Sequence, residues 1–160
     1  MISLRDINWN NFWGVVNLKV SEEQKNNLPS NAVFMAQAYI NLKMQYKDIC
    51  FAIYYNDDLI GFTKIVFIEQ NEEKFNFSED TYYIDAIMID EKYQGKGYGK
   101  LALSKILDFI QTEPWGKVRS VKLSCYDTNK AAINLYTQFG FVRTDIFVFG
   151  KEDLRLYIMQ

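Results

Sequence analysis

Residues 81–110 contain an apolar segment, a glycine-rich loop and an amphipathic segment in direct succession. The first segment, TYYIDAIMI at 81–89, is rich in aromatic and β-branched residues and apolar on both faces, which predicts a central strand. Behind the loop, apolar residues recur at helical spacing, namely Leu103, Ile106, Leu107 and Ile110. A buried strand that runs through a loop into an amphipathic helix is typical of an α/β domain.

Elements of both kinds continue on either side of this unit. We expect a strand at 1–7, helices at 8–18 and 28–44, a hairpin at 49–68, an acidic loop at 69–80, a strand at 118–126, a helix at 127–140 and a hairpin at 141–159. No linker, repeat or low-complexity segment interrupts the order. A chain of 160 residues is long enough for one core, so residues 1–160 are predicted to form a single domain.

Three of the eight glycines, Gly95, Gly97 and Gly99, fall within five positions of the loop. Glycines at the start of a helix let an anion approach bare backbone N–H groups, with the helix dipole behind them. Lys96 and Lys100 add positive charge beside them. The spacing therefore favours a phosphate site, while a plain strand-to-helix turn stays an alternative.

Two other glycine motifs compete for the same loop. The P-loop pattern fails because Leu101, rather than Ser or Thr, follows Lys100. Gly97, Gly99 and Ala102 do satisfy the dinucleotide pattern G-x-G-x-x-A. In that fold, however, the first glycine follows its strand almost at once, whereas DEKYQGK separates Ile89 from Gly97 here. The context argues against a nicotinamide oxidoreductase.

Composition excludes several kinds of site. The chain has no histidine, which removes Ser-His-Asp and Cys-His catalysis and most transition-metal sites. Cys50 and Cys125 lie far apart in apolar runs and are expected to be buried free thiols. A net charge of −2 offers no basic footprint for nucleic acid. We expect no metal, no membrane segment and no signal peptide, and hence a cytoplasmic protein.

Charge is unevenly distributed along the chain. Residues 69–91 carry eight acids and one base, Lys74, whereas residues 92–122 carry seven Lys or Arg and two acids. Solvated surface explains any single charge. The pattern as a whole suits an anionic ligand at the second segment and a cationic one near the first.

Two short motifs resemble those of the GNAT superfamily of N-acetyltransferases. QGKGYG at 94–99 is similar to the family's Q/R-x-x-G-x-G/A loop, and NKAAINLYTQFGF at 129–141 is similar to its N-x-x-A-x-x-L-Y-x-x-x-G-F segment. The expected element order also resembles the GNAT fold. The resemblance implies a central mixed, mostly antiparallel β-sheet flanked by about four helices, and an enzyme that uses acetyl-CoA.

The resemblance also implies roles for individual residues. Pantetheine would pair with the backbone of the central strand, at Ile87, Met88 and Ile89. Pyrophosphate would be held by the backbone of the loop, at Gln94, Gly95, Lys96, Gly97, Tyr98, Gly99 and Lys100. Asn129 matches a residue that contacts the cofactor, and it is also a good helix N-cap. Tyr136 matches a tyrosine that protonates the leaving thiolate, although packing in a helix stripe would also explain it.

Asp85 is the only charged residue in TYYIDAIMI. Strand alternation predicts that it shares a face with Tyr83, Ile87 and Ile89, where desolvation would raise its pKa. The family resemblance makes it a candidate catalytic base; a polar residue that serves a bulge or a neighbouring strand is the alternative. No Cys or Ser is placed as a nucleophile, so direct attack by the amine is the expected mechanism.

The acceptor is expected to be a small cationic amine. Residues 17–39 and the DEKYQGKG segment at 90–97 are similar to bacterial spermine/spermidine acetyltransferases of the superfamily, which implies a polyamine. Candidate cation partners are Glu22, Glu23, Glu79, Asp80 and Asp85. Acetylation of a protein N-terminus or an aminoglycoside-like amine, and a non-catalytic CoA-binding module, remain alternatives. A homodimer that extends the sheet through the C-terminal hairpin is left open.

Overall fold

A computed structural model describes residues 1–24, 29–72, 75 and 77–160 of the chain. Its strands form one sheet in the order β1-β2-β3-β4-β5-β7-β6. All neighbours in this sheet are antiparallel except the parallel pair β4–β5. The strands are β1 (Ile2–Asp6), β2 (Lys47–Tyr55), β3 (Asp58–Ile68), β4 (Thr81–Ile89), β5 (Ser120–Tyr126), β6 (Val142–Phe147) and β7 (Leu154–Met159). The mixed, mostly antiparallel sheet with TYYIDAIMI at its centre confirms the prediction.

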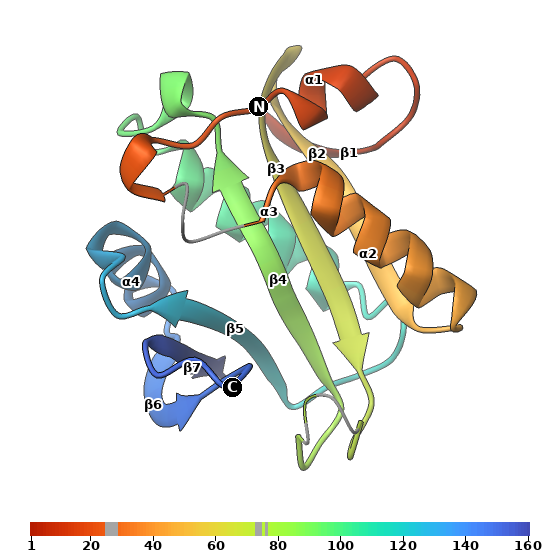
Figure 1. Ribbon diagram of the computed structural model, residues 1–160, viewed down its shortest axis with the longest axis vertical. Coiled ribbons are helices and arrows are strands. Elements are labelled where there is room, and N and C mark those ends of the chain that lie inside the picture. Colours follow the sequence, from red (N-terminus) through yellow and green to blue (C-terminus); the bar gives the residue numbers. More distant parts are fainter. Residues whose placement is uncertain (25–28, 73–74, 76) are drawn as a thin grey trace.

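The α-helices cover both faces of this sheet (Figure 1). They are α1 (Phe12–Val16), α2 (Asn31–Lys43), α3 (Tyr98–Gln111) and α4 (Lys130–Gln138), with short 3-10 turns at η1 (Glu22–Gln24) and η2 (Glu91–Tyr93). Phe34 of α2 packs with Phe62 and Met88 on one face. Leu103 of α3 and Tyr136 of α4 pack into the core on the other face. The four predicted helices are therefore present in the predicted order.

The helix predicted at 8–18 is much shorter than expected. Helix α1 spans five residues and begins after Asn11 rather than Asn8. The Asn11 side chain accepts a bond from the Asn8 amide and donates one to the Asp6 carbonyl. Asparagine side chains compete with helical backbone bonds in this way, so the segment before Phe12 forms a turn instead.

Strands β4 and β5 pair only over Thr81–Ile84 and Ser120–Leu123. Beyond these residues β5 turns away toward α4, and the two strands separate (Figure 1). Parallel pairing that stops halfway leaves the outer half of β4 without a neighbour on that side. This opening divides the sheet into two arms, a first arm of β1–β4 and a second arm of β5–β7.

A bulge interrupts β4 where the opening begins. Lys64 and Ile65 of β3 pair with Ala86 and Ile84, so Asp85 has no partner in the register. An extra residue in a strand reverses the alternation after it. Ile87 and Ile89 accordingly pack with Ala102 of α3, while Asp85 reaches Lys64 near Phe34 of α2. The prediction that Asp85 shares a face with Ile87 and Ile89 is therefore wrong.

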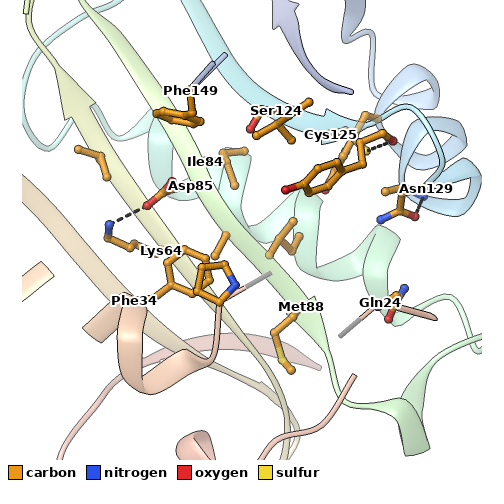
Figure 2. A pocket seen from close by; sticks show the side chains of 18 of the residues that line it. Gln24, Phe34, Lys64, Ile84, Asp85, Met88, Ser124, Cys125, Asn129 and Phe149 are labelled. Carbon is orange, nitrogen blue, oxygen red and sulfur yellow. Dashed lines mark hydrogen bonds and ion pairs between the residues drawn. The ribbon is translucent and has the colours of Figure 1, made fainter. Parts of the chain in front are cut away.

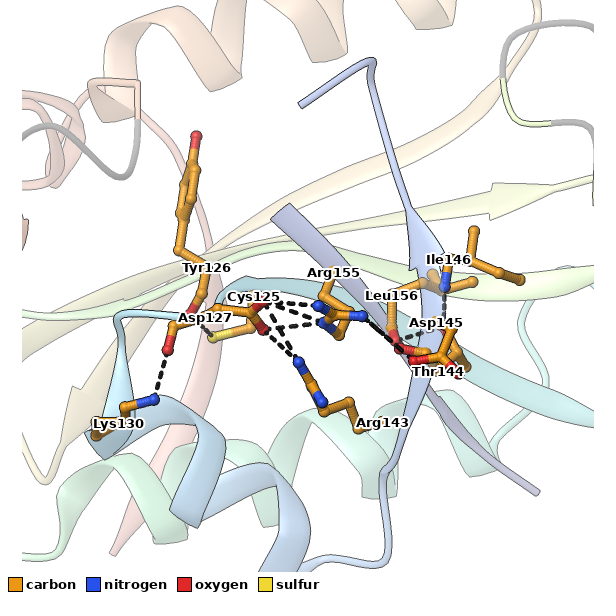
Figure 3. Close-up of polar contacts among 10 residues, drawn as sticks. All are labelled: Cys125, Tyr126, Asp127, Lys130, Arg143, Thr144, Asp145, Ile146, Arg155 and Leu156. Carbon is orange, nitrogen blue, oxygen red and sulfur yellow. Dashed lines mark hydrogen bonds and ion pairs between the residues drawn. The ribbon is translucent and has the colours of Figure 1, made fainter. Parts of the chain in front are cut away.

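An ion-pair cluster holds the second arm of the sheet together (Figure 3). Asp127, directly after β5, accepts bonds from Nε and Nη2 of Arg155 in β7, at 3.0 and 2.8 Å. Arg143 of β6 adds a contact of 3.3 Å. The bonds from Arg155 are the main reason that the pKa of Asp127 falls to about 2. Three strands are thus tied at one carboxylate.

Candidate active site

A cavity of about 590 Å³ lies where β4 and β5 separate. Residues 84–89 of β4 and 124–126 of β5 form two of its walls, and α2, α4 and the β6–β7 turn contribute further side chains. Figure 2 shows Asp85, Ser124, Cys125 and Asn129 around it. The opening in the sheet therefore forms a site in which a ligand would contact both arms.

The outer half of β4 directs backbone groups into this cavity. The Asp90 amide donates to the Ile60 carbonyl in β3 at 2.8 Å. Backbone groups alternate in direction along a strand, so those of Met88 also face β3, whereas those of Ile87 and Ile89 face the opening. Of the three residues predicted to pair with pantetheine, Ile87 and Ile89 thus have the required direction.

The glycine loop has the geometry of an anion site. Gly95 and Gly97 have φ of 73° and 82°, a left-handed conformation that favours glycine, and Gly97 is the N-cap of α3. The Lys100 amide makes a bond of 3.1 Å to the Gly97 carbonyl. The amides of Tyr98 and Gly99 precede it and lack a carbonyl one turn back within the helix. These groups fit the pyrophosphate of acetyl-CoA.

Gln94 fixes the loop to its surroundings. Its Nε2 donates to the Ile89 carbonyl at 2.8 Å and to Oε1 of Gln24 in η1 at 2.9 Å. The Lys96 ammonium donates to the Lys92 carbonyl at 2.8 Å. Of the predicted loop residues, Gln94, Gly95 and Gly99 line the cavity. Lys96 and Lys100 are exposed.

Two predicted residues of the α4 segment, Asn129 and Tyr136, also line the cavity. Asn129 accepts a bond of 3.2 Å from the Ala132 amide, which confirms it as the N-cap of α4. Tyr136 packs edge-on against Phe141, with ring centroids 6.0 Å apart. Burial raises the pKa of Tyr136, so its phenol is protonated at neutral pH.

Asp85 lies at the cavity wall with one oxygen engaged. Its Oδ2 accepts a bond of 2.7 Å from the ammonium of Lys64 in β3. In Figure 2 this pair lies between the rings of Phe34 and Phe149. Asp85 thus lies at a bulge and contacts a neighbouring strand, as predicted for a polar residue without a catalytic role. It nevertheless also lines the cavity.

The other predicted acidic residues lie elsewhere. Asp80 is exposed and accepts a bond of 2.7 Å from the Gln70 amide. Glu79 accepts bonds from Ser120 and Lys122 at 2.6 and 3.0 Å. Glu22 is exposed in η1, and the side chain of Glu23 lies outside the described part of the structure. Among the predicted acceptor residues that are described, Asp85 alone lines the cavity.

Sequence reasoning missed Lys64, which also lines the cavity. Lys64 is the only charged residue in LIGFTKIVFI, residues 59–68. A single charge in such an apolar strand signals a buried partner, as the single acid of TYYIDAIMI did. The pairing itself depends on the register between β3 and β4.

Comparisons with known proteins agree with this geometry. The chain matches the acetyltransferase (GNAT) family over residues 14–141. A spermine/spermidine N(1)-acetyltransferase of Bacillus subtilis (strain 168) is 32% identical over 141 residues, which cover 88% of this chain and 87% of the relative.

Solved structures share the fold at lower identity. The spermidine N-acetyltransferase of Vibrio cholerae, in complex with CoA and spermine, has a TM-score of 0.68 at 17% identity, covering 99% of this chain and 94% of that one. Arabidopsis thaliana Naa50, in complex with a bisubstrate analogue, has a TM-score of 0.64 at 19% identity, covering 99% and 98%. The open sheet, the glycine loop and the family match lead to one conclusion: the chain belongs to the acetyltransferase (GNAT) family.

Proposed function

We propose that this GNAT acetyltransferase transfers the acetyl group of acetyl-CoA to a primary amine of a polyamine such as spermine or spermidine. The observation that carries the proposal is the place of Asp85, a carboxylate at the wall of the cavity. The relative from Bacillus subtilis, whose name includes the same substrates, supports it. A carboxylate in a partly closed site binds an ammonium group by charge and hydrogen bonds.

Aromatic rings at the cavity wall also favour a cationic acceptor. Phe34, Phe75 and Phe149 come from three separate parts of the chain and all line the cavity. The rings of Phe75 and Phe149 lie 5.6 Å apart at an angle of 76°. The face of an aromatic ring attracts a cation, and its body packs against the methylene chain of a polyamine.

Acetyl-CoA supplies the acetyl thioester when it is bound. The backbone of Ile87 would pair with its pantetheine arm, and the loop amides of residues 95–100 would hold its pyrophosphate. Asn129, at the cavity wall, would contact the same arm. This assignment rests on the open edge of β4 and on the left-handed glycines at the start of α3.

Proton transfer would need two residues of the chain. Asp85 would orient the acceptor amine and take up its proton, directly or through water. Tyr136 would give its proton to the departing thiolate, because a buried, protonated phenol is a suitable acid for that group.

The thiol in the cavity wall is a poor nucleophile, which supports direct attack by the amine. Cys125 is buried, and burial is the main reason that its pKa rises to about 12. The thiolate is therefore scarce near neutral pH. The neighbouring Ser124 accepts a bond of 2.7 Å from the Tyr83 hydroxyl.

An acceptor screen tests the proposal. Release of the CoA thiol is measured with spermidine, a monoamine, a peptide and an aminoglycoside, at low and high salt. We expect spermidine to give the highest kcat/KM, and its KM to rise with salt because screening acts over about 8–10 Å at physiological ionic strength. Asp85→Asn should lower kcat/KM for spermidine by roughly 10²-fold, within the range of acid–base groups.

Asp108→Asn is the matched control. It removes a carboxylate from the exposed face of α3, where Asp108 pairs with Lys105 at 3.6 Å. Its kinetics should match those of the unaltered protein. Equal activity toward spermidine and the monoamine, together with a fully active Asp85→Asn variant, would contradict the polyamine proposal.

We also infer that the protein works in the cytoplasm. Cys50 and Cys125 are both free thiols, which favours a reducing compartment. Among the described residues, none of the helices is long and apolar enough to cross a membrane.

A further inference from the structure

Lys64 joins two carboxylates at the wall of the cavity. Its Nζ lies 2.7 Å from Oδ2 of Asp85 and 3.3 Å from Oδ2 of Asp48 in β2. Lys64 is 2% exposed and Asp48 is 4% exposed. The ammonium is thus held away from solvent, while Asp85 reaches the cavity.

A contact from helix α2 also holds this cluster in place. The Asn41 amide in α2 donates to Oδ2 of Asp48 at 2.6 Å. One connected set of contacts therefore runs from α2 through β2 and β3 to Asp85 in β4. Figure 2 shows the last part, in which Lys64 extends toward Asp85.

Stability alone does not explain the cluster. Desolvation of a buried ion pair often exceeds the energy of its attraction, and apolar residues of similar size commonly serve a core as well. In addition, Oδ1 of Asp48 is buried and has no hydrogen-bond partner within the described residues. Buried polar groups are nearly always bonded, so this cluster costs free energy that apolar residues at the same positions would not.

The excess of carboxyl groups in the cluster suits the binding of a cationic acceptor. Asp48 and Asp85 share a single ammonium, so the carboxyl groups of the cluster outnumber its ammonium by one. Within the described part of the chain, the bond from Lys64 goes to Oδ2 of Asp85, so Oδ1 can accept a bond from a ligand in the cavity. A fixed carboxylate with one free oxygen is suited to bind and orient one ammonium group.

We propose that Lys64 is a positioning residue of the acceptor site, which holds the Asp85 carboxylate oriented toward the reacting amine. The proposal rests on the function proposed above and deepens it. Lys64 does not touch the reacting atoms. It acts through Asp85, and Asp48 and Asn41 hold it in place.

The titratable groups around Asp85 determine the effect of removing Lys64. They are Asp48 and Cys50 of β2 and Tyr83 of β4, while α2 contributes the uncharged Asn41. Burial already raises the pKa of Asp48. Without the Lys64 ammonium, the carboxylates of Asp48 and Asp85 would face each other. A nearby like charge raises the affinity of a carboxylate for a proton.

The test compares Lys64→Met with the conservative Lys64→Arg. We expect Lys64→Met to raise the KM for spermidine at least ~10-fold, a coupling of ~1.4 kcal/mol, and to leave the KM for acetyl-CoA within about twofold. The acidic limb of its kcat/KM profile for spermidine should move up by about one pH unit, as expected when a carboxylate loses a cationic neighbour. Lys64→Arg should keep the acidic limb of the unaltered protein.

A double-mutant cycle separates positioning from general damage. In the Asp85→Asn background, Lys64→Met should raise the KM for spermidine no further, since residues that act as a unit are not additive. Additive losses, or an unmoved acidic limb in Lys64→Met, would overturn the proposal. A merely structural role would lower the unfolding temperature and leave the pH profile in place.

One further variant covers the case in which Lys64→Met does not fold. Asp48→Asn with Lys64→Met removes one charge of each sign, and the raised KM for spermidine should persist in it. An unaltered KM in this double variant would overturn the proposal. If the unaltered protein acetylates no amine at all, the proposed function fails first, and the role of Lys64 fails with it.

Discussion

The Tyr136 side chain combines a packing contact with an ionisable group at a cavity wall. Phenylalanine keeps the ring against Phe141 and removes only the hydroxyl. We expect Tyr136→Phe to lower kcat by roughly 10²-fold, because general acid catalysis contributes about 10²–10⁴-fold. Steady-state kinetics with acetyl-CoA and spermidine measure the change, and circular dichroism should show an unaltered fold. Near-normal kcat would return Tyr136 to a packing role.

At the scale of single elements, the start of α3 offers a matched pair of glycines. Gly97 has φ of 82°, so Gly97→Ala is strained, by about 1–2 kcal/mol for a left-handed residue. Gly99 lies within the helix, and an added Cβ would meet Leu135 at an ordinary 3.6 Å. We expect Gly97→Ala to raise the KM for acetyl-CoA several-fold and Gly99→Ala to change it little. Equal effects of both variants would contradict an anion site at this N-cap.

The second arm of the sheet should respond to acid through Asp127. The bonds from Arg155 lower the pKa of Asp127 to about 2, from an ordinary ~3.9 in unfolded chains. A lowered pKa stabilises the fold above pH ~4, and this contribution is lost as the pH falls toward ~2. Thermal unfolding should therefore show a lower Tm for Asp127→Asn at neutral pH and a difference that shrinks between pH 4 and 2.

Asp145→Asn is the control for this prediction. Asp145 is fully exposed and contacts the same arginine, Arg155, at 3.5 Å. Exposed ion pairs contribute little to stability, so its Tm should match that of the unaltered protein throughout. A difference for Asp127→Asn that did not depend on pH would contradict the ion-pair explanation.

At the scale of the whole molecule, the two arms meet at a short parallel ladder of 81–84 with 120–123. A ligand that bonds to both arms should stabilise the folded state as a unit. At a concentration of 100 Kd, acetyl-CoA should add about 2.7 kcal/mol, which is about 5–10 °C in Tm for a domain of this size. Thermal shift measures it, with NADH as the control. A shift with NADH and none with acetyl-CoA would reinstate the dinucleotide alternative.

Local patterns in the sequence predicted the elements and several parts of the site. Helical spacing placed α3, turn residues placed the hairpins, and the glycine loop appears with left-handed backbone at Gly95 and Gly97. Hydrogen bonds and side-chain period within one element depend on neighbours in the chain, so they can be predicted from the sequence. The error at residues 8–18 is local too, because the competition between asparagine side chains and the backbone was misjudged there.

Only the tertiary structure decided how the strands meet. The bulge at Asp85, the parting of β4 from β5 and the contact of Asp85 with Lys64 all depend on pairing between separate segments. Changing such a register by one residue moves side chains to the opposite face, and the sequence period carries no record of it. The sequence by itself determined which elements form and that a loop with left-handed glycines precedes α3. The fold determined which charges share a site, because cross-strand contacts join residues far apart in the chain.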